Sequence, residues 1–404
     1  MNILIVTPHY YPENFRINDL VKELKNKSHN ITVLTAIPDY PAGKYYSGYG
    51  LFKKNREVLE GVSIYRAPII ARGSGTKLRL FLNYFSLIFG SLFTSLFLLN
   101  RNFDVIFVFA PSPITIAIPA IIIKKIKNIL LCLWVQDLWP ESVSASGKLK
   151  SNIIPRLLNP LVKFIYKNSN KILVPSNGYK LSIKKKGISE SKISFLPNWA
   201  EKIYKVIKNS EKKLDFIPNN SFKIMFAGNI GFAQDFPSIL NAAKILKNEN
   251  IHWLILGNGS KVQWVKKRIQ NYELMDCFHM LGTYPVNEMP QFFSLADAML
   301  FSLIDEDIFS LTIPSKVQSY LACGKPILGM INGEGSDLIN NSNAGLTCPA
   351  GDSRGLSENI LKMSNMSSDE INKIGNNSYN YYKKHFDRKM LINKVENILS
   401  DLIR

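Results

Sequence analysis

Short apolar runs alternate with amphipathic stretches along the first half of the chain. The apolar runs have the length of buried strands, and the stretches between them show helical periodicity. The expected strands are 2–6, 31–35, 62–66, 104–109, 129–135, 171–175 and 193–196, and the expected helices are 16–27, 114–125 and 177–186. This alternation predicts a parallel sheet with helices on both faces.

A polar segment, 201–221, has the composition of a linker, and the alternation restarts after it. The second series has expected strands at 223–227, 251–256, 278–281, 298–302 and 327–331, and expected helices at 237–247, 260–271, 288–296 and from about 315 to Gly324. A long amphipathic helix over 378–403 follows.

The expected fold class is therefore α/β, with two tandem doubly wound domains of the Rossmann-like type. We expect residues 1–200 to form the first domain and residues 201–379 the second, with the helix at 380–404 packing back on the first. Ligands of such sheets bind beyond the carboxyl ends of the strands, so the active site is expected in the cleft between the domains.

Residues 300–327 combine a strand, an acidic loop and a helix start. The sequence Thr312-Ile313-Pro314-Ser315 predicts the helix start, because Pro fits a first turn and Ser or Thr side chains cap free N–H groups. A helix N-terminus favours anions, and Lys316 in the first turn opposes the helix dipole unless an anion is bound. An ordinary strand–helix unit with a surface lysine is the alternative.

Two loops after strands of the second series are rich in glycine. Gly228 and Gly231 follow the strand at 223–227, and Gly257 and Gly259 follow the strand at 251–256. Glycine lets a backbone approach a phosphate or base closely, although a simple turn would use the same residue. The string GNG is not GxGxxG, so no dinucleotide cofactor is expected.

No pattern in the sequence predicts a bound metal. The run Asp305-Glu306-Asp307 matches the DxD of metal-dependent sugar transferases, but we interpret it as a solvated acidic loop. The four cysteines are scattered in apolar surroundings without ligand spacing, as in a reduced cytosolic protein.

Positive charge is concentrated in one half of the chain. Of the net charge of +19, residues 1–200 carry +17 and residues 201–404 carry +2. This asymmetry predicts an anionic partner for the first half, a phospholipid surface or a nucleic acid. No nucleic-acid-binding motif accompanies the charge, so the membrane surface is favoured.

The segment 80–99 has no charged residue and is long enough to span a bilayer. Polar residues interrupt it, however, and it lies inside a strand–helix series whose parts a span would separate. We expect a packed helix that touches the bilayer with its end or one face, ahead of a true span or a core helix. No secretory signal precedes the strand at 2–6, which predicts a cytoplasmic protein bound peripherally to the inner face of the membrane.

Eight strings, taken together, resemble a known enzyme group. They are YYPENFRINDL (10–20), IPDYPAGKYYSGYG (37–50), GVSIYRAP (61–68), VQDLWPES (135–142), PNWA (197–200), FAGNIGFAQD (226–235), LGNG (256–259) and TIPSKVQSYLACGKPIL (312–328). In this order they resemble the GT-B glycosyltransferases of family 4. More narrowly, they resemble bacterial O-antigen and capsule enzymes that transfer N-acetyl-L-fucosamine, and their colanic-acid relatives.

The resemblance implies a nucleotide-diphosphate sugar bound mainly by the second domain and an acceptor bound by the first. It also implies retention at the anomeric carbon without a metal or other cofactor. The implied donor-binding residues are Gly228, Asn229, Gly231, Gln234, Gly257, Gly259, Thr312, Ile313, Pro314, Ser315, Lys316 and Gln318. Glu13, Asn14 and Arg16 fall on the first-domain loop that approaches the phosphates, and Gln136 falls where many members carry a His, with Asp137 beside it.

The sequence departs from the wider family at two pairs of positions. Leu311 and Ser319 replace the two acids of Glu-x7-Glu, with Gln318, Asp305 and Glu306 as possible substitutes. Asn229 and Gln234 replace the Arg and Lys that neutralise the diphosphate. Lys316, Arg16 and the helix dipole would then stabilise the leaving pyrophosphate.

The implied reaction is transfer of a deoxyamino sugar, N-acetyl-L-fucosamine, from a UDP-sugar to an undecaprenyl-diphosphate-linked saccharide. It would belong to O-antigen, capsule or lipopolysaccharide biosynthesis. We favour front-face attack, with Asp137 and Gln136 positioning the acceptor hydroxyl; Asp137 as a turn cap is the alternative. The rival functions are a UDP-sugar epimerase or phosphorylase of the same fold and a non-catalytic basic membrane-binding protein. None of the five His lies in the donor loops, which argues against the epimerase.

Overall fold

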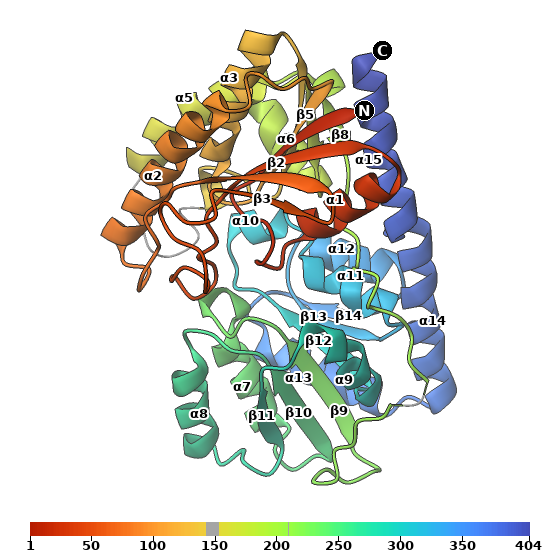
Figure 1. The fold of residues 1–404 in the computed structure, drawn as a ribbon. Coiled ribbons are helices and arrows are strands. Elements are labelled where there is room, and N and C mark those ends of the chain that lie inside the picture. Colours follow the sequence, from red (N-terminus) through yellow and green to blue (C-terminus); the bar gives the residue numbers. More distant parts are fainter. Residues whose placement is uncertain (143–152, 209) are drawn as a thin grey trace. The chain divides into compact units, whose positions relative to one another are not determined.

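The computed structural model describes residues 1–142, 153–208 and 210–404, and the chain divides into two compact units. Unit 1 comprises Met1–Leu196 together with Lys389–Arg404, and unit 2 comprises Pro197–Arg388. Each unit is a mainly parallel sheet covered by helices (Figure 1). The predicted α/β class of two tandem doubly wound domains is confirmed.

The sheet of unit 1 has the strand order β3-β4-β2-β1-β5-β6-β7-β8 within the described residues. All neighbouring pairs are parallel except the antiparallel pair of β3 and β4. The central strand β1 is almost completely buried, because strands enclosed by helices on both faces are apolar throughout. The strands are β1 (Asn2–Val6), β2 (Asn30–Ala36), β3 (Arg56–Leu59), β4 (Val62–Ala67), β5 (Val105–Ala110), β6 (Leu130–Val135), β7 (Lys171–Val174) and β8 (Ile193–Phe195).

The helices of unit 1 include one series that packs side by side. In this series α3 lies against α2 and α5 lies against α3 (Figure 1). The described helices are α1 (Arg16–Asn26), α2 (Lys77–Leu96), α3 (Ala117–Lys127), α5 (Ile153–Asn168), α6 (Asn177–Lys185) and α15 (Arg388–Ile403), with 3-10 turns at Ile114–Ile116 and Glu190–Lys192. The helix expected at 114–125 therefore begins with a 3-10 turn.

The single helix expected over 378–403 is wrong. The chain instead forms α14 (Ser368–His385) and α15, which are interrupted at Phe386. Phe386 is buried in the core of unit 2, and its φ of −128° leaves the helical region. The amphipathic pattern continues across the interruption, so the sequence alone did not indicate where the first helix ends and the second begins.

Helix α15 packs on unit 1 through apolar and polar contacts. Its apolar side chains Leu391, Ile392, Val395 and Leu399 are buried. Glu396 pairs with Lys27, at the end of α1, and accepts a hydrogen bond from His29 at 2.9 Å.

The sheet of unit 2 has the order β11-β10-β9-β12-β13-β14, and every neighbouring pair is parallel in the part that the structure describes. Met225 and Ala227 of β9 enter the core on one face, and Ile224 and Phe226 enter the core on the other. The strands are β9 (Phe222–Ala227), β10 (Ile251–Leu256), β11 (Phe278–Gly282), β12 (Ala298–Ser302), β13 (Ile327–Met330) and β14 (Gly345–Cys348). Besides α14, the helices are α7 (Phe236–Ile245), α8 (Val262–Asn271), α9 (Met289–Leu295), α10 (Asp307–Ser310), α11 (Ser315–Ala322), α12 (Glu334–Asn341) and α13 (Ser353–Ser364), with 3-10 turns at Phe232–Gln234 and Val286–Glu288.

The polar segment expected as a linker, 201–221, belongs to unit 2, and part of it packs on the rest of that unit. Ile217 is buried in the core of that unit. The ring of Tyr204 stacks on the ring of Phe293, with centroids 5.8 Å apart.

Candidate active site

The loops after β9 and β10 touch each other through their backbones. The amide of Gly228 donates to the carbonyl of Leu256 at 2.9 Å. A Cβ on Gly257 would lie 1.8 Å from the carbonyl oxygen of Gly228, and a Cβ on Gly259 would lie 2.3 Å from that of Ile230. Gly228 and Gly257 also have φ of +138°, which L side chains rarely adopt. Glycine is therefore required here by the close approach of two loops.

Lys316, in the first turn of α11, places its ammonium group beside these glycine loops. Its Nζ is buried and lies 4.1 Å from the centroid of the Phe226 ring. A Cβ on Gly228 would come within 2.6 Å of this Nζ. Within the described part of the chain, no acceptor lies at hydrogen-bond distance from it. Burial lowers the pKa of Lys316 to about 7.

A buried cation without a counter-charge is costly, so this arrangement suits an anionic ligand. The residue exposes part of its surface while the nitrogen is covered. The structure thus places the lysine that the sequence predicts to bind an anion beside the glycine loops, and its binding of an anion stays a prediction.

The start of α11 differs from the expected capped start. Pro314 occupies the N-cap position, and among the described residues no side chain caps it. Thr312 Oγ1 instead donates to the carbonyl of Ile308 at 2.8 Å, and Ser315 is exposed as the first helical residue. The expectation of a Ser or Thr cap was wrong, because the fixed φ of Pro314 sets the turn into the helix.

Asn229 and Gln234, which the resemblance places where the wider family has basic residues, hold the loop after β9 together. Gln234 Oε1 accepts from the amide of Gly231 at 3.1 Å and from Asn229 Nδ2 at 3.3 Å. Ser302 Oγ of β12 donates to the carbonyl of Gln234 at 2.7 Å. The two side chains are neutral, which leaves Lys316 as the cation of this cluster.

The proposed substitutes for the missing acids have separate surroundings. Gln318 is fully buried, and with its amide oriented to satisfy both groups it donates to the carbonyls of Pro314 and Ser315 at 3.0 Å. Ile313 is also buried, in the core of unit 2. Asp305 accepts from Asn332 at 2.8 Å in the exposed acidic loop.

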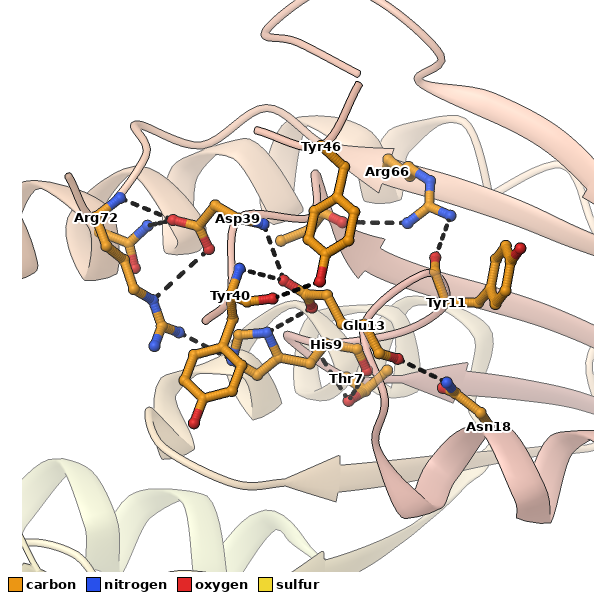
Figure 2. A network of polar contacts seen from close by, with 12 residues as sticks. Thr7, His9, Tyr11, Glu13, Asn18, Asp39, Tyr40, Tyr46, Arg66 and Arg72 are labelled. Atoms are coloured by element: carbon orange, nitrogen blue, oxygen red, sulfur yellow. Dashed lines mark hydrogen bonds and ion pairs between the residues drawn. The ribbon is translucent and has the colours of Figure 1, made fainter. Parts of the chain in front are cut away.

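In unit 1, the loop after β1 is organised around the buried carboxylate of Glu13 (Figure 2). Its Oε1 accepts from the amides of Asp39 and Tyr40, at 2.8 and 2.7 Å, and its Oε2 lies 2.7 Å from His9 Nδ1. Asn18 Nδ2 of α1 donates to the carbonyl of Glu13 at 2.7 Å. Glu13 therefore ties the loop after β1 to the loop after β2.

His9 joins Glu13 to Arg72 (Figure 2). Arg72 Nη2 lies 2.9 Å from His9 Nε2, and because a guanidinium can only donate, Nε2 is the acceptor. The ring proton is then on Nδ1, where it is donated to Glu13. The imidazole stacks on Phe15, with ring centroids 4.5 Å apart.

Arg72 is a cation with a second, acidic neighbour. Asp39 Oδ2 accepts from the backbone amide of Arg72 at 2.7 Å, and Arg72 Nε lies 3.7 Å from Asp39 Oδ1. Burial raises the pKa of Asp39. Asn83 Nδ2 of α2 also donates to Asp39 Oδ2, at 3.3 Å.

The remaining first-domain candidates lie around this network. Asn14 is exposed, and Arg16 is half-buried as the first residue of α1. Arg66 is fully buried; it pairs with Glu57 and donates from Nη2 to the carbonyl of Tyr11 at 2.6 Å. Arg66 thus supports the opposite side of the loop that carries His9 and Glu13 (Figure 2).

Gln136 and Asp137 directly follow β6. Asp137 Oδ2 accepts from the amide of Ser112 at 3.0 Å, and burial raises the pKa of Asp137. The backbone oxygen of Gln136 accepts from Tyr179 at 3.3 Å, while its Nε2 is buried without a hydrogen-bond partner among the described residues. The carboxylate of Asp137 is thus bonded to a residue 25 positions earlier. That contact speaks against the turn-cap alternative.

The pKa of Tyr84, on α2, is affected by residues of both polar clusters of unit 1. Burial raises the pKa of Tyr84, while the charge of Arg72 and a hydrogen bond with Ser112 lower it. Asp137 and Asp39 both influence the same hydroxyl.

Sequence reasoning did not select His9, Arg72 or Tyr84 as site residues. His9 and Glu13 are four residues apart, which was an available signal for a paired His and acid. Arg72 joins them from 63 residues away through the fold, which sequence spacing could not show.

No group of three or more His, Cys, Asp or Glu side chains suited to a metal occurs in residues 1–142, 153–208 and 210–404. The four cysteines are buried and free. Metal independence of the reaction stays a prediction.

Both doubly wound units match glycosyltransferase family models, so the chain is a glycosyltransferase with the GT-B fold. Residues 15–201 match the family model described as Glycosyltransferase Family 4, and residues 207–381 match that of Glycosyl transferases group 1. The chain belongs to glycosyltransferase family 4.

Relatives and a solved structure agree with this assignment. The chain is 30% identical to the probable glycosyltransferase WbjE of Pseudomonas aeruginosa over 54% of this chain and 56% of the relative, so the match spans little more than half of that protein. It is 24% identical to the putative colanic acid biosynthesis glycosyl transferase WcaI of Escherichia coli K12, over 80% of this chain and 82% of the relative. The crystal structure of Anabaena Alr3699/HepE in complex with UDP has a TM-score of 0.70 at 14% identity, covering 99% of this chain and all of that one. The structural likeness concerns the fold.

Proposed function

We propose that the protein is a retaining glycosyltransferase of surface-polysaccharide biosynthesis. It transfers a deoxyamino sugar, N-acetyl-L-fucosamine, from its UDP derivative to an undecaprenyl-diphosphate-linked saccharide at the cytoplasmic face of the membrane. The similarity to WbjE and to the colanic-acid relative WcaI supports the glycosyltransferase class and the polysaccharide role. The UDP complex of HepE supports a UDP-linked donor. The sugar rests on the resemblance described above.

The observation that carries the proposal is the buried ammonium of Lys316 without an acceptor in the described part of the chain. It lies where the Gly228 loop meets the N-terminus of α11, so a bound diphosphate would favour the charged form of this amine and would also face the positive end of the helix dipole. Desolvation strengthens such a contact. The neutral Asn229 and Gln234 provide no competing cation.

In the proposed reaction the acceptor oxygen attacks the anomeric carbon on the face from which UDP leaves. The bond between that carbon and the β-phosphate oxygen breaks, the new glycosidic bond forms, and the hydroxyl proton passes to the departing phosphate. Lys316 stabilises the negative charge that develops on the leaving diphosphate. Asp137 and Gln136 orient the acceptor hydroxyl; no metal is required.

The test is a thermal-shift titration with UDP, GDP, dTDP and NAD. A ligand that binds only the folded state raises the unfolding midpoint as its concentration increases. We expect a rise with UDP that is lost in Lys316→Met and kept in Lys266→Met, which removes an exposed lysine of α8. A midpoint that no nucleotide changes would overturn the donor site.

A transfer assay then identifies the reaction. Incubation with UDP-sugars and a polyprenyl-diphosphate-linked saccharide, with and without EDTA, should give an EDTA-resistant product that keeps the donor's anomeric configuration. Conversion of the UDP-sugar itself without an acceptor would instead show an epimerase. Binding to vesicles without a response to any nucleotide would show the non-catalytic membrane-binding protein.

A further inference from the structure

Helix α2 exposes a row of phenylalanines. Phe81, Phe85, Phe89 and Phe93 recur at every fourth position and Phe97 follows the last turn; each exposes between 47 and 63% of its surface. Residues four apart lie on the same helix face. The ring centroids of Phe85 and Phe89 are 4.5 Å apart, and those of Phe93 and Phe97 are 5.6 Å apart. We call these five residues the phenylalanine row.

The opposite face of α2 is fixed to unit 1. Asn83 Nδ2 donates to the carbonyl of Ile70 at 2.7 Å, and Ser86 Oγ accepts from the amide of Ile70 at 2.9 Å. A Cβ on Gly90 would lie 2.1 Å from the carbonyl oxygen of Pro68, so the helix and that loop are in close contact. The length and composition of α2 would allow a membrane span. Surrounding it with lipid would, however, break these contacts and expose its buried polar side chains.

The helices next to the phenylalanine row are basic and contain no acid. The sequences of α2, α3 and α5 include no Asp or Glu. Their basic residues are Lys77 and Arg79 of α2, Lys124, Lys125 and Lys127 of α3, and Arg156, Lys163 and Lys167 of α5. Exposed apolar side chains continue on α3 and α5 at Ile122, Ile126, Leu157 and Phe164. The three helices pack in series (Figure 1).

We infer that α2, with α3 and α5 beside it, docks unit 1 on an anionic phospholipid bilayer, with the phenylalanine row inserted among the lipid chains. A bilayer offers hydrocarbon to the phenylalanines and phosphates to the lysines and arginines at the same interface. A second copy of the chain would oppose basic helices to basic helices, which disfavours self-association through this face.

This binding mode would also bring the cluster of His9, Asp39 and Arg72 close to the lipid surface. Asn83 belongs to the same helix as the phenylalanine row and donates to Asp39. The inference itself concerns lipid binding and does not depend on the sugar or on the donor site.

The test is co-sedimentation of the full chain with vesicles of phosphatidylethanolamine and phosphatidylglycerol. We expect the wild type to bind these vesicles, and to bind phosphatidylcholine vesicles more weakly. The double variant Phe85→Ser, Phe89→Ser should bind at least about tenfold more weakly, since two large apolar groups no longer insert. Phe216→Ser, which replaces a similarly exposed phenylalanine of unit 2, should bind as the wild type does.

Other outcomes separate the rival occupants. Equal vesicle binding by the double variant, or none by the wild type, overturns the inference. If the wild type is a dimer without lipid and the double variant is a monomer, the phenylalanine row is a self-association face. If the wild type resists alkaline extraction from membranes, α2 spans the bilayer. Either result also overturns the inference. The thermal shift with UDP, measured on every variant, reports separately on the donor site and on folding.

Discussion

Nη2 of Arg72 lies 2.9 Å from Nε2 of His9, so a permanently charged guanidinium donates to a neutral imidazole. The imidazole can accept only because Glu13 takes the proton of Nδ1 at 2.7 Å. Protonation of His9 would place a second N–H opposite Arg72. The three residues therefore form a chain in which the orientation of each side chain depends on the next.

Replacement of Glu13 by Gln should destabilise the protein. An amide can accept with one end only, and its NH2 group would face an amide of Asp39 or Tyr40, or the imidazole N–H. Loss of buried hydrogen bonds to a charged acceptor should reduce the free energy of unfolding by about 2–3 kcal/mol. Urea denaturation measures this loss. Glu60→Gln, at an exposed pair with Lys22, should change it by less than about 1 kcal/mol, and equal effects of the two changes would contradict the role of Glu13.

Lys316 should make the stability of the ligand-free protein rise with pH. Its pKa falls from 10.5 in the unfolded chain to about 7 in the folded protein. Between these values the unfolded chain binds a proton that the folded protein lacks, so the free energy of unfolding increases with pH. The contribution amounts to about 1.4 kcal/mol per pH unit in the middle of this range. Chemical denaturation of the wild type and of Lys316→Met at several pH values isolates the contribution of Lys316. If the free energy of unfolding depends on pH identically in both proteins, the lowered pKa of Lys316 is refuted.

The same group should take up a proton when UDP binds. At about pH 8 the ammonium is mostly deprotonated in the free protein, and a bound diphosphate favours its charged form. Calorimetric titrations in two buffers of different ionisation enthalpy count the protons transferred. We expect uptake by the wild type, and also by Lys266→Met. A binding enthalpy that is the same in both buffers would show that no proton is taken up, and would contradict a contact between Lys316 and the diphosphate.

The contact between the two glycine loops should tolerate no side chain. In Gly257→Ala, a methyl group would meet the carbonyl of Gly228 at 1.8 Å, and φ of +138° adds backbone strain. We expect a loss of about 3 kcal/mol in the free energy of unfolding together with weaker UDP binding. Gly351→Ala is the matched control, because Gly351 also has a positive φ but has nothing within 4 Å of the added Cβ. Gly351→Ala should lower the free energy of unfolding by about 1 kcal/mol and leave UDP binding unchanged.

Replacement of Asp137 by Asn should separate catalysis from stability. The amide oxygen of Asn can still accept from Ser112, and the cost of burying a charge is removed. Burial raises the pKa of Asp137 in the folded protein above its value in the unfolded chain. Between these two pKa values the free energy of unfolding falls as pH rises, because the folded protein binds a proton that the unfolded chain has lost. This decrease should be absent in the variant. The free energy of unfolding at neutral pH should stay the same or increase, while sugar transfer falls about 100-fold. A destabilised variant with normal transfer would make Asp137 a structural residue.

Much of this architecture could be predicted from local patterns. Buried parallel strands appear as continuous apolar runs, so the positions of both sheets followed from runs such as those of β5 and β6. Gly228 and Gly257 were recognisable because each directly follows such a run. Lys316 was recognisable because a cation in the first turn of a helix conflicts with the dipole.

Contacts between distant segments were not predictable in this way. Arg72 reaches His9 only because the loop after β4 folds beside the loop after β1, and neither segment shows periodicity that could reveal it. The interruption at Phe386 was missed because amphipathic periodicity continues through it. The start of α11 was misassigned because Pro314 takes the N-cap position that a Ser or Thr was expected to fill.

The return of α15 to unit 1 has a consequence for how the chain is made. The last segment of unit 1, Lys389–Arg404, follows the whole of unit 2 in the sequence. A ribosome therefore finishes unit 2 before it supplies the helix that pairs with Lys27 and His29, and unit 1 stays without this helix until then. A chain that stops after α14 would contain every candidate donor and acceptor residue and still lack a complete first unit, so such a fragment should be a target for chaperones and proteases.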